Sequence, residues 1–218
     1  MSGGIQRKIF NERAMQNPTS APELANIPYT LIACVNQYDE LLMVQRTKAP
    51  FAGCWNFIGG KIEAGESPSS AAIRELNEEA GQTTTLRRRV QFRGIALWPI
   101  AGMQFHYLGM YLFLYRCRTT DAETRQFAML DEGVTAWIHL DLLLDGSSLK
   151  LVPNFDLLLP YLLDSRKNPC IVCHEVTDVG VRLIWNAVIP KATRDIATSP
   201  HSSKFLNVDD LRGFRNAR

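Results

Sequence analysis

The sequence predicts an α+β fold, in the form of an α/β/α sandwich around a mixed β-sheet. Three observations support this prediction. Short runs rich in apolar, β-branched and aromatic residues recur along the chain, only two segments have helical character, and these two do not alternate regularly with the strands. We find no internal repeat, which excludes a repeat architecture.

The first half of the predicted sheet begins with a hairpin. Residues 29–35 (YTLIACV) and 41–46 (LLMVQR) are apolar and partly β-branched, and the polar residues 36–40 between them predict a turn. Residues 47–56 contain Pro50 and Gly53, which interrupt regular structure, and we expect a loop there.

A helix is predicted over residues 68–80. Ser67 is a preferred N-cap, Pro68 suits the first helical position, and Gly81 suits the stop after the last turn. The remaining elements follow from the same patterns: strands at 89–96, 105–118 and 136–140, a polar linker at 119–131, a helix at 155–163, and a hairpin at 170–175 and 179–189.

The chain of 218 residues, 46% of them hydrophobic, suits one folded domain with extensions. We expect an N-terminal arm at 1–27, the main domain at 28–165, a C-terminal β-hairpin extension at 166–190 and a flexible tail at 191–218. Pro28 and Pro190 lie near the two changes of pattern.

Composition excludes several classes of protein. A net charge of +2 is too small to indicate a nucleic-acid-binding surface. No apolar run approaches the roughly 20 residues of a membrane-spanning helix, and the first residues lack the apolar core of a signal peptide. We therefore expect a cytoplasmic protein that binds neither nucleic acid nor membranes, and the pattern leaves a homodimer open.

The five cysteines do not form a disulfide framework, because their number is odd and the chain is long. Cys170-Ile171-Val172-Cys173-His174 matches the spacing of a haem-attachment pattern, C-x-x-C-H. No second pair of ligands at metal-binding spacing accompanies it, so we interpret the segment as a strand with alternating faces. None of the four histidines is predicted to be a metal ligand.

The helix at 68–80 carries a cluster of carboxylates. At 100° per residue, Ala72, Leu76 and their neighbours share one arc, and three glutamates share another: Glu75, Glu78 and Glu79. Like charges at these spacings repel by about 0.2–0.5 kcal/mol per pair on an exposed helix. The cluster is either a solvated acidic face or a site compensated by Arg74 and a hard cation such as Mg²⁺.

These residues fit a known pattern, G-x5-E-x7-R-E-U-x-E-E-x-G-U, in which U is aliphatic. The matching positions are Gly60, Glu66, Arg74, Glu75, Leu76, Glu78, Glu79 and Gly81, and only Gln82 departs from the pattern. The segment therefore resembles the Nudix box, and the chain resembles the Nudix hydrolases. The departure at Gln82 affects a packing position.

The resemblance implies a Nudix-type α/β/α sandwich and hydrolysis of a nucleoside diphosphate linked to another group, with Mg²⁺ or Mn²⁺. It implies that Glu75, Glu78 and Glu79 are metal ligands, with a further contact from the Gly60 carbonyl. It also implies that Arg74 orients the carboxylates. Which carboxylate is the general base stays open.

Outside the box the chain resembles the MutT-like 8-oxo-dGTP diphosphatases over roughly residues 29–163. On this resemblance, Glu132 donates a distant carboxylate to the metal site, and Asn56 and Asn154 read the purine base. A side-chain amide presents a donor and an acceptor together, which suits the O6 and N7–H edge of 8-oxoguanine. Asn56 could instead cap a turn, and Asn154 could be the N-cap of the helix at 155–163.

Two further residues are predicted near the substrate. Arg46 matches a region close to the substrate in relatives, although an exposed arginine at a strand end is an equal alternative. Phe51 could stack on a base.

The sequence thus predicts hydrolysis of 8-oxo-dGTP or a related purine nucleoside triphosphate to the monophosphate and pyrophosphate. Pro99, downstream of the box, favours an alternative: a hydrolase of ADP-ribose or another nucleotide conjugate. A second alternative is a non-catalytic Nudix ligand-binding or regulatory module, with residues 166–218 as a partner arm, a dimer contact or a lid.

Overall fold

A computed structural model describes residues 24–80, 90–103, 106–119, 128–130, 133–145, 148–164, 169–189, 198 and 205–207. The helices within these ranges are α1 (Pro68–Ala80), α3 (Leu140–Leu144) and α4 (Phe155–Leu163). The strands are β1 (Leu24–Val35), β2 (Glu40–Arg46), β3 (Trp55–Phe57), β4 (Gln91–Pro99), β5 (His106–Arg116), β6 (Ala128–Leu130), β7 (Gly133–His139), β8 (Cys170–Thr177), β9 (Gly180–Val188) and β10 (Phe205–Asn207).

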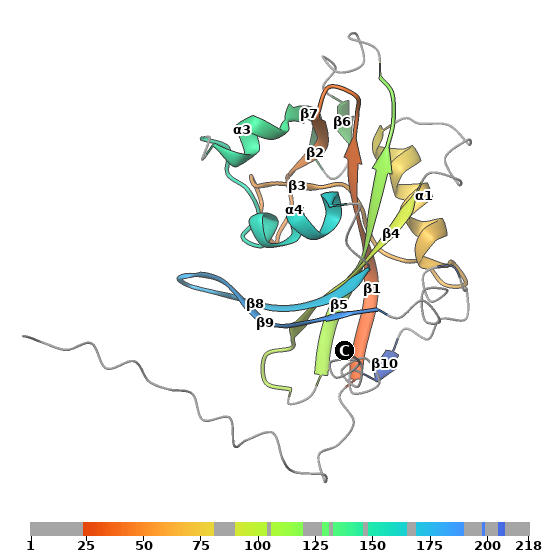
Figure 1. Cartoon of the computed structure of the whole chain (residues 1–218), viewed down its shortest axis with the longest axis vertical. Helices are drawn as coiled ribbons and strands as arrows, with labels where there is room; N and C mark the ends of the chain where they lie inside the picture. The colour runs from red at the N-terminus through yellow and green to blue at the C-terminus, as the bar shows by residue number, and fades with distance from the viewer. Residues whose placement is uncertain are drawn as a thin grey trace, which may run out of the picture.

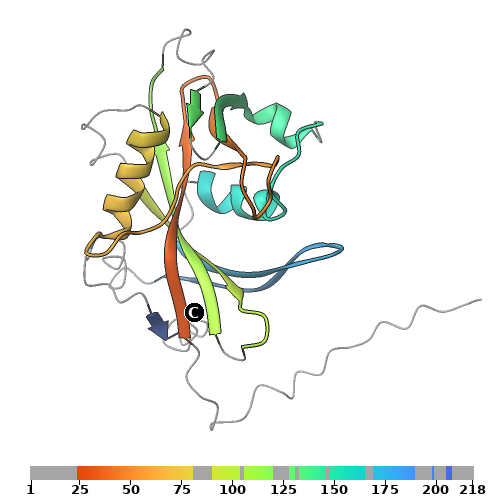
Figure 2. The ribbon, with the colours of Figure 1, turned by 180° about the vertical axis from the view of Figure 1, so that it is seen from behind.

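The strands form one mixed sheet in the order β6-β7-β2-β1-β5-β4-β8-β9, with β3 paired to β2 and β10 paired to β1. The pairs β1–β5 and β4–β8 are parallel, and the other pairs are antiparallel. Figure 1 shows α1 on one side of the central strands and α3 and α4 on the other, and Figure 2 shows the same layers from behind. This arrangement confirms the predicted α+β class with a mixed sheet.

Two hydrophobic cores lie on the two faces of the β1–β5 pair. On β1, Ile32 and Cys34 belong to the core that includes Leu76 of α1, whereas Leu31 and Ala33 belong to the core that includes α4. On β5, the same alternation separates Tyr111, Phe113 and Tyr115 from Leu112 and Leu114. Because both faces are covered, the two strands are apolar at nearly every position, and the period of two assigns each side chain to a core.

Several short elements were not predicted. The expectation of a loop over 47–56 is wrong at its end, because Trp55 and Asn56 belong to β3, which pairs with β2. A linker was expected over 119–131, but residues 128–130 form β6. A strand alone was expected at 136–140, but α3 begins at Leu140, directly after β7. Strand β1 begins within the expected arm at 1–27, and β10 lies within the expected tail at 191–218. These elements have three to five residues, except β1, and so are too short to show a periodicity.

The predicted C-terminal hairpin continues the sheet. Strand β8 runs parallel to β4, with Gly94 opposite Cys170 and Leu97 opposite Cys173. Gly94 lies at a register shift of β4 with φ 144°, and a Cβ at this position would overlap the carbonyl oxygen of Cys170. Glycine is therefore required for β8 to approach β4.

A buried arginine joins α4 to the same strand. Arg93 of β4 is 5% exposed, and its guanidinium donates to the backbone carbonyls of Tyr161 and Asp164 at the end of α4. Burial lowers the pKa of Arg93, and the nearby Cys170 and Asp164 partly oppose this effect. The last carbonyls of a helix carry a partial negative charge, so this cation stabilises the C-terminal end of α4.

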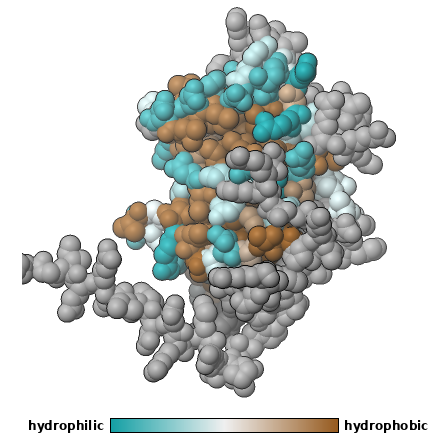
Figure 3. Space-filling view, in the orientation of Figure 1, coloured by the Kyte–Doolittle hydropathy of each residue, from teal (hydrophilic) through white to brown (hydrophobic). Residues whose placement is uncertain are grey.

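Apolar side chains also gather at the surface over α3 and α4 (Figure 3). Leu142 and Leu144 of α3 are more than half exposed. A groove of about 390 Å³ beside them is lined by Leu143, Leu144, Leu149, Leu151, Asp156, Leu159 and Pro160. Among the described residues, no helix has the length and apolar character needed to cross a bilayer.

The requirement for glycine at residue 94 can be tested with two alanine variants. Gly94→Ala combines an unfavourable φ with steric overlap, whereas Gly180→Ala, with φ 132°, combines a similar φ with open space. We expect Gly180→Ala to lower the free energy of unfolding by about 1 kcal/mol and Gly94→Ala to lower it by about 2 kcal/mol more. Equal losses in urea denaturation would contradict the close approach of β8 to β4.

Candidate active site

The loop before α1 is held against β1 by backbone hydrogen bonds. The N–H of Thr30 donates to the Gly60 carbonyl at 2.8 Å, and the N–H of Ile32 donates to the Ile58 carbonyl at 2.9 Å. At the start of α1, the N–H of Ser70 donates to Ser67 Oγ at 3.1 Å, which confirms the predicted N-cap. The loop is thus bonded to the central sheet, and the helix that follows it begins at a defined N-cap.

Two glycines allow the loop to approach the carboxylates of α1. Gly59 has φ 136°, and its N–H donates to Glu79 Oε2 at 2.9 Å. A Cβ on Gly60 would overlap the carboxylate of Glu75, and a Cβ on Gly59 would overlap the carbonyl oxygen of Thr30. The Gly59-Gly60 backbone therefore lies against the carboxylates of α1 because neither residue carries a Cβ.

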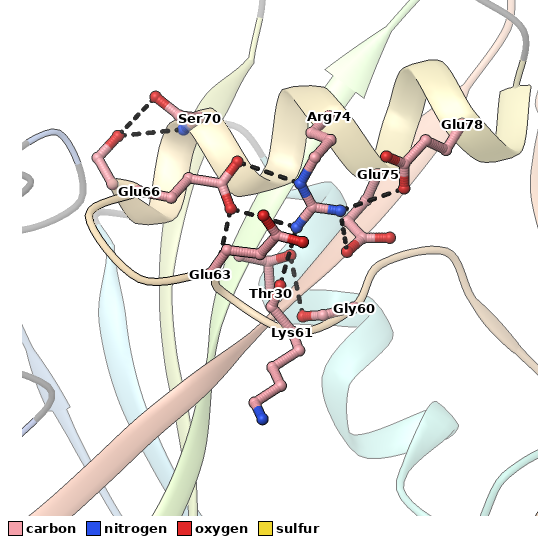
Figure 4. A network of polar contacts seen from close by, with 10 residues as sticks. Thr30, Gly60, Lys61, Glu63, Glu66, Ser70, Arg74, Glu75 and Glu78 are labelled. Carbon is pink, nitrogen blue, oxygen red and sulfur yellow. Dashed lines mark hydrogen bonds and ion pairs between the residues drawn. The ribbon is translucent and has the colours of Figure 1, made fainter.

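Arg74 lies at the centre of the cluster (Figure 4). Its Nη1 donates to Glu75 Oε1 at 2.8 Å and to Glu78 Oε2 at 3.1 Å. Its Nε and Nη2 each lie 3.2 Å from one oxygen of Glu66. Its Nη2 also donates to the Lys61 carbonyl at 2.8 Å. One guanidinium thus joins the loop to three carboxylates by charge-assisted hydrogen bonds.

The electrostatics of this cluster follow from its burial. Burial alone would lower the pKa of the Arg74 guanidinium, but its hydrogen bonds to Glu66 and Glu75 and the charges of these carboxylates raise the pKa above its ordinary value. Arg74 therefore stays charged. The glutamates of the helix differ in burial. Glu75 and Glu79 are buried, with 8% and 6% of their surfaces exposed. The Glu78 side chain is 57% exposed.

These exposures decide between the two interpretations of the acidic helix. A solvated acidic face would place all its carboxylates in water, whereas Glu75 and Glu79 are buried against the loop. Burying charged groups costs free energy unless other charges or hydrogen bonds offset it. The helix therefore does not present a solvated acidic face, because two of its carboxylates are buried against the loop.

The donor atoms of the cluster fit a hard divalent cation. Glu66, Glu75, Glu78 and Glu79 supply four carboxylates against the single guanidinium of Arg74, and all the candidate ligands are oxygens. Within the described residues, no three acidic, histidine or cysteine side chains already converge as a metal-binding group. Glu75 and Glu78 are instead turned toward Arg74, and Glu79 is turned toward Gly59.

The segments that carry the two predicted base-reading residues lie side by side. The N–H of Trp55 donates to the Lys150 carbonyl at 2.7 Å, and the N–H of Val152 donates to the Trp55 carbonyl at 3.0 Å. Next to them, the rings of Phe57 and Phe155 stack with centroids 4.7 Å apart. Because Asn56 precedes Phe57 and Asn154 precedes Phe155, the fold brings together two segments that are far apart in the sequence.

The two asparagines have different surroundings. Asn56 is half-buried, and its Oδ1 accepts from the adjacent Phe57 N–H at 2.9 Å. Asn154 occupies the N-cap position of α4, but its side chain makes no capping hydrogen bond. Its Nδ2 lies 3.2 Å from His174 Nε2 of β8. Asn154 thus stands at the N-cap position that was the alternative to base reading, without the side-chain bond that such a cap ordinarily makes.

Sequence reasoning missed His174. The residue is 1% exposed, and its ring lies 6.0 Å from that of Trp98 between centroids. Burial lowers the pKa of the imidazole, and the backbone of Val172 and Leu97 partly opposes this effect. The pattern C-x-x-C-H gave no signal that this ring would lie beside Asn154. That contact depends on the pairing of β8 with β4 in the sheet.

The remaining predicted site residues are Arg46, Phe51 and Glu132. Arg46 Nε donates to the Pro50 carbonyl at 2.9 Å, so the side chain supports the loop between β2 and β3. Phe51 of this loop is 42% exposed, and its φ of 64° is unusual for a residue other than glycine. Glu132, the predicted distant metal ligand, lies outside the described residues.

A family profile agrees with the fold and the site. The profile of the NUDIX domain matches residues 27–157, which is more than half of the chain. The protein therefore belongs to the Nudix family.

Curated relatives differ in the substrates that their names state. The 8-oxo-dGDP phosphatase NUDT18 of Mus musculus is 40% identical over 57 residues, 26% of this chain and 18% of that protein. The oxidized purine nucleoside triphosphate hydrolase of Danio rerio is 30% identical over 116 residues, 51% of this chain and 65% of that protein. The ADP-ribose pyrophosphatase of Methanocaldococcus jannaschii is 36% identical over 47 residues, 22% and 28% of the two chains. The chain thus spans less than two thirds of each relative.

A solved structure supports the fold. The mutator MutT protein from Bacillus halodurans superposes with a TM-score of 0.53 at 22% identity, covering 75% of this chain and 95% of that chain. At this identity the likeness concerns the fold alone, and it agrees with the mixed sheet and the helices described above.

Removal of the central cation should destabilise the protein. We expect Arg74→Met to lower the free energy of unfolding by about 2 kcal/mol at pH 7, because it leaves partly buried carboxylates without a partner. The loss should shrink as the pH falls toward about 4, where carboxylates take up protons. The measurement is urea denaturation across this pH range.

A surface ion pair provides the control for this variant. Arg182 bonds Glu175 at 2.6 Å, and its side chain is 66% exposed. Arg182→Met should cost less than about 1 kcal/mol. If Arg74→Met cost no more than Arg182→Met, Arg74 would not be the residue that holds the cluster together.

Proposed function

We propose that this protein is a Mg²⁺- or Mn²⁺-dependent pyrophosphohydrolase of 8-oxo-dGTP or a related oxidised purine nucleoside triphosphate, releasing the monophosphate and pyrophosphate. The observation that carries the proposal is the burial of Glu75 and Glu79 against the Gly59-Gly60 loop, with Arg74 bonded to Glu66, Glu75 and Glu78. Such a cluster costs stability and is typical of a site and not of a surface.

A divalent cation would be held by Glu75, Glu78 and Glu79, with the Gly60 carbonyl and Glu132 as further candidate ligands. When bound, it would neutralise phosphate oxygens and lower the pKa of an attacking water. In the structure the Gly60 carbonyl accepts from the Thr30 N–H at 2.8 Å and from Thr30 Oγ1 at 3.5 Å, so a cation would compete with the longer of these two bonds.

The chain's own residues position these ligands. Arg74 keeps Glu75 and Glu78 within reach of the loop, and the Gly59 N–H holds one oxygen of Glu79. These contacts hold the carboxylates beside the loop, and a bound cation would draw Glu75, Glu78 and Glu79 together from these positions. Any of the three carboxylates could act as the general base.

The preference for a purine rests on Asn56 and Asn154. Their segments are hydrogen-bonded side by side, so both amides could face one base. The N7–H and O6 of 8-oxoguanine offer a donor and an acceptor, which one amide can match. The names of two relatives, which refer to oxidised purine nucleotides, support this assignment. Phe51 and Arg46 are candidates for stacking on the base and for binding the phosphates.

A parallel assay of substrates tests the proposal. With Mg²⁺ present, we expect kcat/KM for 8-oxo-dGTP to exceed that for dGTP at least tenfold, about 1.4 kcal/mol of discrimination. The readout is the release of pyrophosphate and monophosphate. Including 8-oxo-dGDP distinguishes a diphosphate substrate, which would release phosphate instead. Equal turnover of 8-oxo-dGTP and dGTP would overturn the preference for an oxidised base.

ADP-ribose is the second candidate substrate. The similarity to a protein named ADP-ribose pyrophosphatase favours it, as does Pro99 at the end of β4. Turnover of ADP-ribose alone in the same assay would keep the carboxylate site and remove the base-reading roles of Asn56 and Asn154.

Replacement of one carboxylate tests whether this site catalyses the reaction. Glu79→Gln keeps the shape of the side chain and removes its charge, so we expect kcat/KM to fall at least about 100-fold. Glu63→Gln, in the exposed part of the same loop, should leave activity within about twofold. Substrate binding without turnover in the unchanged protein would favour the alternative of a ligand-binding or regulatory module.

A further inference from the structure

The side chain of Asn154 does not make the local capping hydrogen bond. An asparagine at a helix N-cap ordinarily accepts from a helix N–H through its side-chain oxygen. Here the backbone carbonyl of Asn154 accepts from Leu158 at 3.1 Å, but the side-chain amide lies against His174 Nε2 at 3.2 Å. A contact with a strand that follows 20 residues later thus replaces the local one.

His174 is held in place from several sides. It is 1% exposed, its ring packs against that of Trp98 on β4, and β8 is bonded to β4 through four consecutive residues of each strand. Because burial lowers its pKa, the imidazole is neutral at pH 7. A neutral imidazole has one N–H donor and one acceptor nitrogen. In the tautomer protonated on Nδ1, Nε2 is an acceptor and faces the Nδ2 end of the amide.

We propose that His174 is a positioning residue that fixes the orientation of the Asn154 amide, so that the β8–β9 hairpin takes part in base recognition. This inference rests on the proposed function, because it assumes that Asn154 contacts a purine. In this arrangement Nε2 accepts from Nδ2, and the ring proton lies on Nδ1, a buried nitrogen for which the structure shows no hydrogen-bond partner. Nδ2 carries two hydrogens, so one N–H and the Oδ1 acceptor stay available to a ligand.

The orientation of the amide decides which purine is preferred. Guanine has acceptors at both N7 and O6, whereas 8-oxoguanine has N7–H as a donor. With Nδ2 directed toward His174, Oδ1 can receive this N7–H. The reverse orientation would turn the nitrogen toward the base, and its N–H groups would repel the N7–H and suit unmodified guanine. His174 therefore acts on selectivity through Asn154.

The exposures of the two residues support this division of roles. Asn154 is half-buried, so a ligand can reach it, whereas His174 is almost fully buried. Asn186 of β9 makes a different contact between the hairpin and α4, with Nδ2 3.4 Å from the Tyr161 hydroxyl. Asn186 therefore offers a control, since its loss disturbs another contact between the β8–β9 hairpin and α4 without touching Asn154.

Binding of reaction products without metal tests the proposal separately from catalysis. Dissociation constants for 8-oxo-dGMP and dGMP are measured by titration calorimetry in the presence of EDTA. We expect the unchanged protein to bind 8-oxo-dGMP at least tenfold more tightly. His174→Phe, which keeps a buried ring, should reduce this ratio to below about threefold, as should Asn154→Ala. His174→Gln, which restores a polar atom, and Asn186→Ala should keep most of the preference.

The double variant Asn154→Ala/His174→Phe shows whether the two residues act as one unit. We expect its ratio to match that of Asn154→Ala alone, because His174 acts only through Asn154. Additive losses, or an unchanged ratio in His174→Phe, would overturn the inference and leave the proposed function intact. If the wild-type protein bound both nucleotides equally, or bound neither, this result would overturn the proposed purine preference and the inference that rests on it.

A measurement on the unchanged protein covers the case in which His174→Phe does not fold. The ¹⁵N NMR spectrum of the imidazole distinguishes a protonated from an unprotonated ring nitrogen. We expect Nε2 of His174 to be unprotonated and Nδ1 to be protonated at pH 7. A proton on Nε2 would require the reverse amide orientation and would overturn the inference.

Discussion

The parallel pairing of β1 with β5 holds both halves of the candidate site in one frame. One face of the pair carries the core under α1, and the other carries the core under α4. The loop that bears Gly60 is bonded along β1, so the carboxylate cluster is fixed to this strand. Strand β5 continues through β4 to β8, which brings His174 to Asn154. The carboxylate cluster and the Asn154–His174 contact therefore depend on one pair of strands.

The acidic cluster and the asparagine segments depend on different interactions, charge compensation in the first and hydrogen-bond direction in the second. The cluster concentrates negative charge, and Arg74 offsets part of this charge while its bonds to the loop fix the geometry. The remaining charge is what a hard cation would offset. The asparagine segments carry no charge and depend on the orientation of amide groups, which hydrogen bonds to buried neighbours can set. Electrostatic compensation thus governs one half of the site, and hydrogen-bond direction governs the other.

The position of the C-terminal hairpin depends on residues of β4 in the central sheet. Gly94 permits β8 to approach β4, and Arg93 beside it bonds the end of α4. The N-terminal end of the same helix carries Asn154. Two neighbouring residues of β4 thus set the positions of β8 and α4, the elements that meet at the Asn154–His174 contact.

The sequence by itself determined the features that depend on local spacing. Ser67 and Pro68 marked the start of α1, the period of the helix grouped Glu75, Glu78 and Glu79, and apolar runs marked β1, β2, β5 and α4. Only the tertiary structure decided which carboxylates are buried, that residues 55–57 pair as β3, and that the Asn154 side chain bonds His174 and not its own helix. These features depend on contacts between residues far apart in the chain, for which local propensity and periodicity carry no signal.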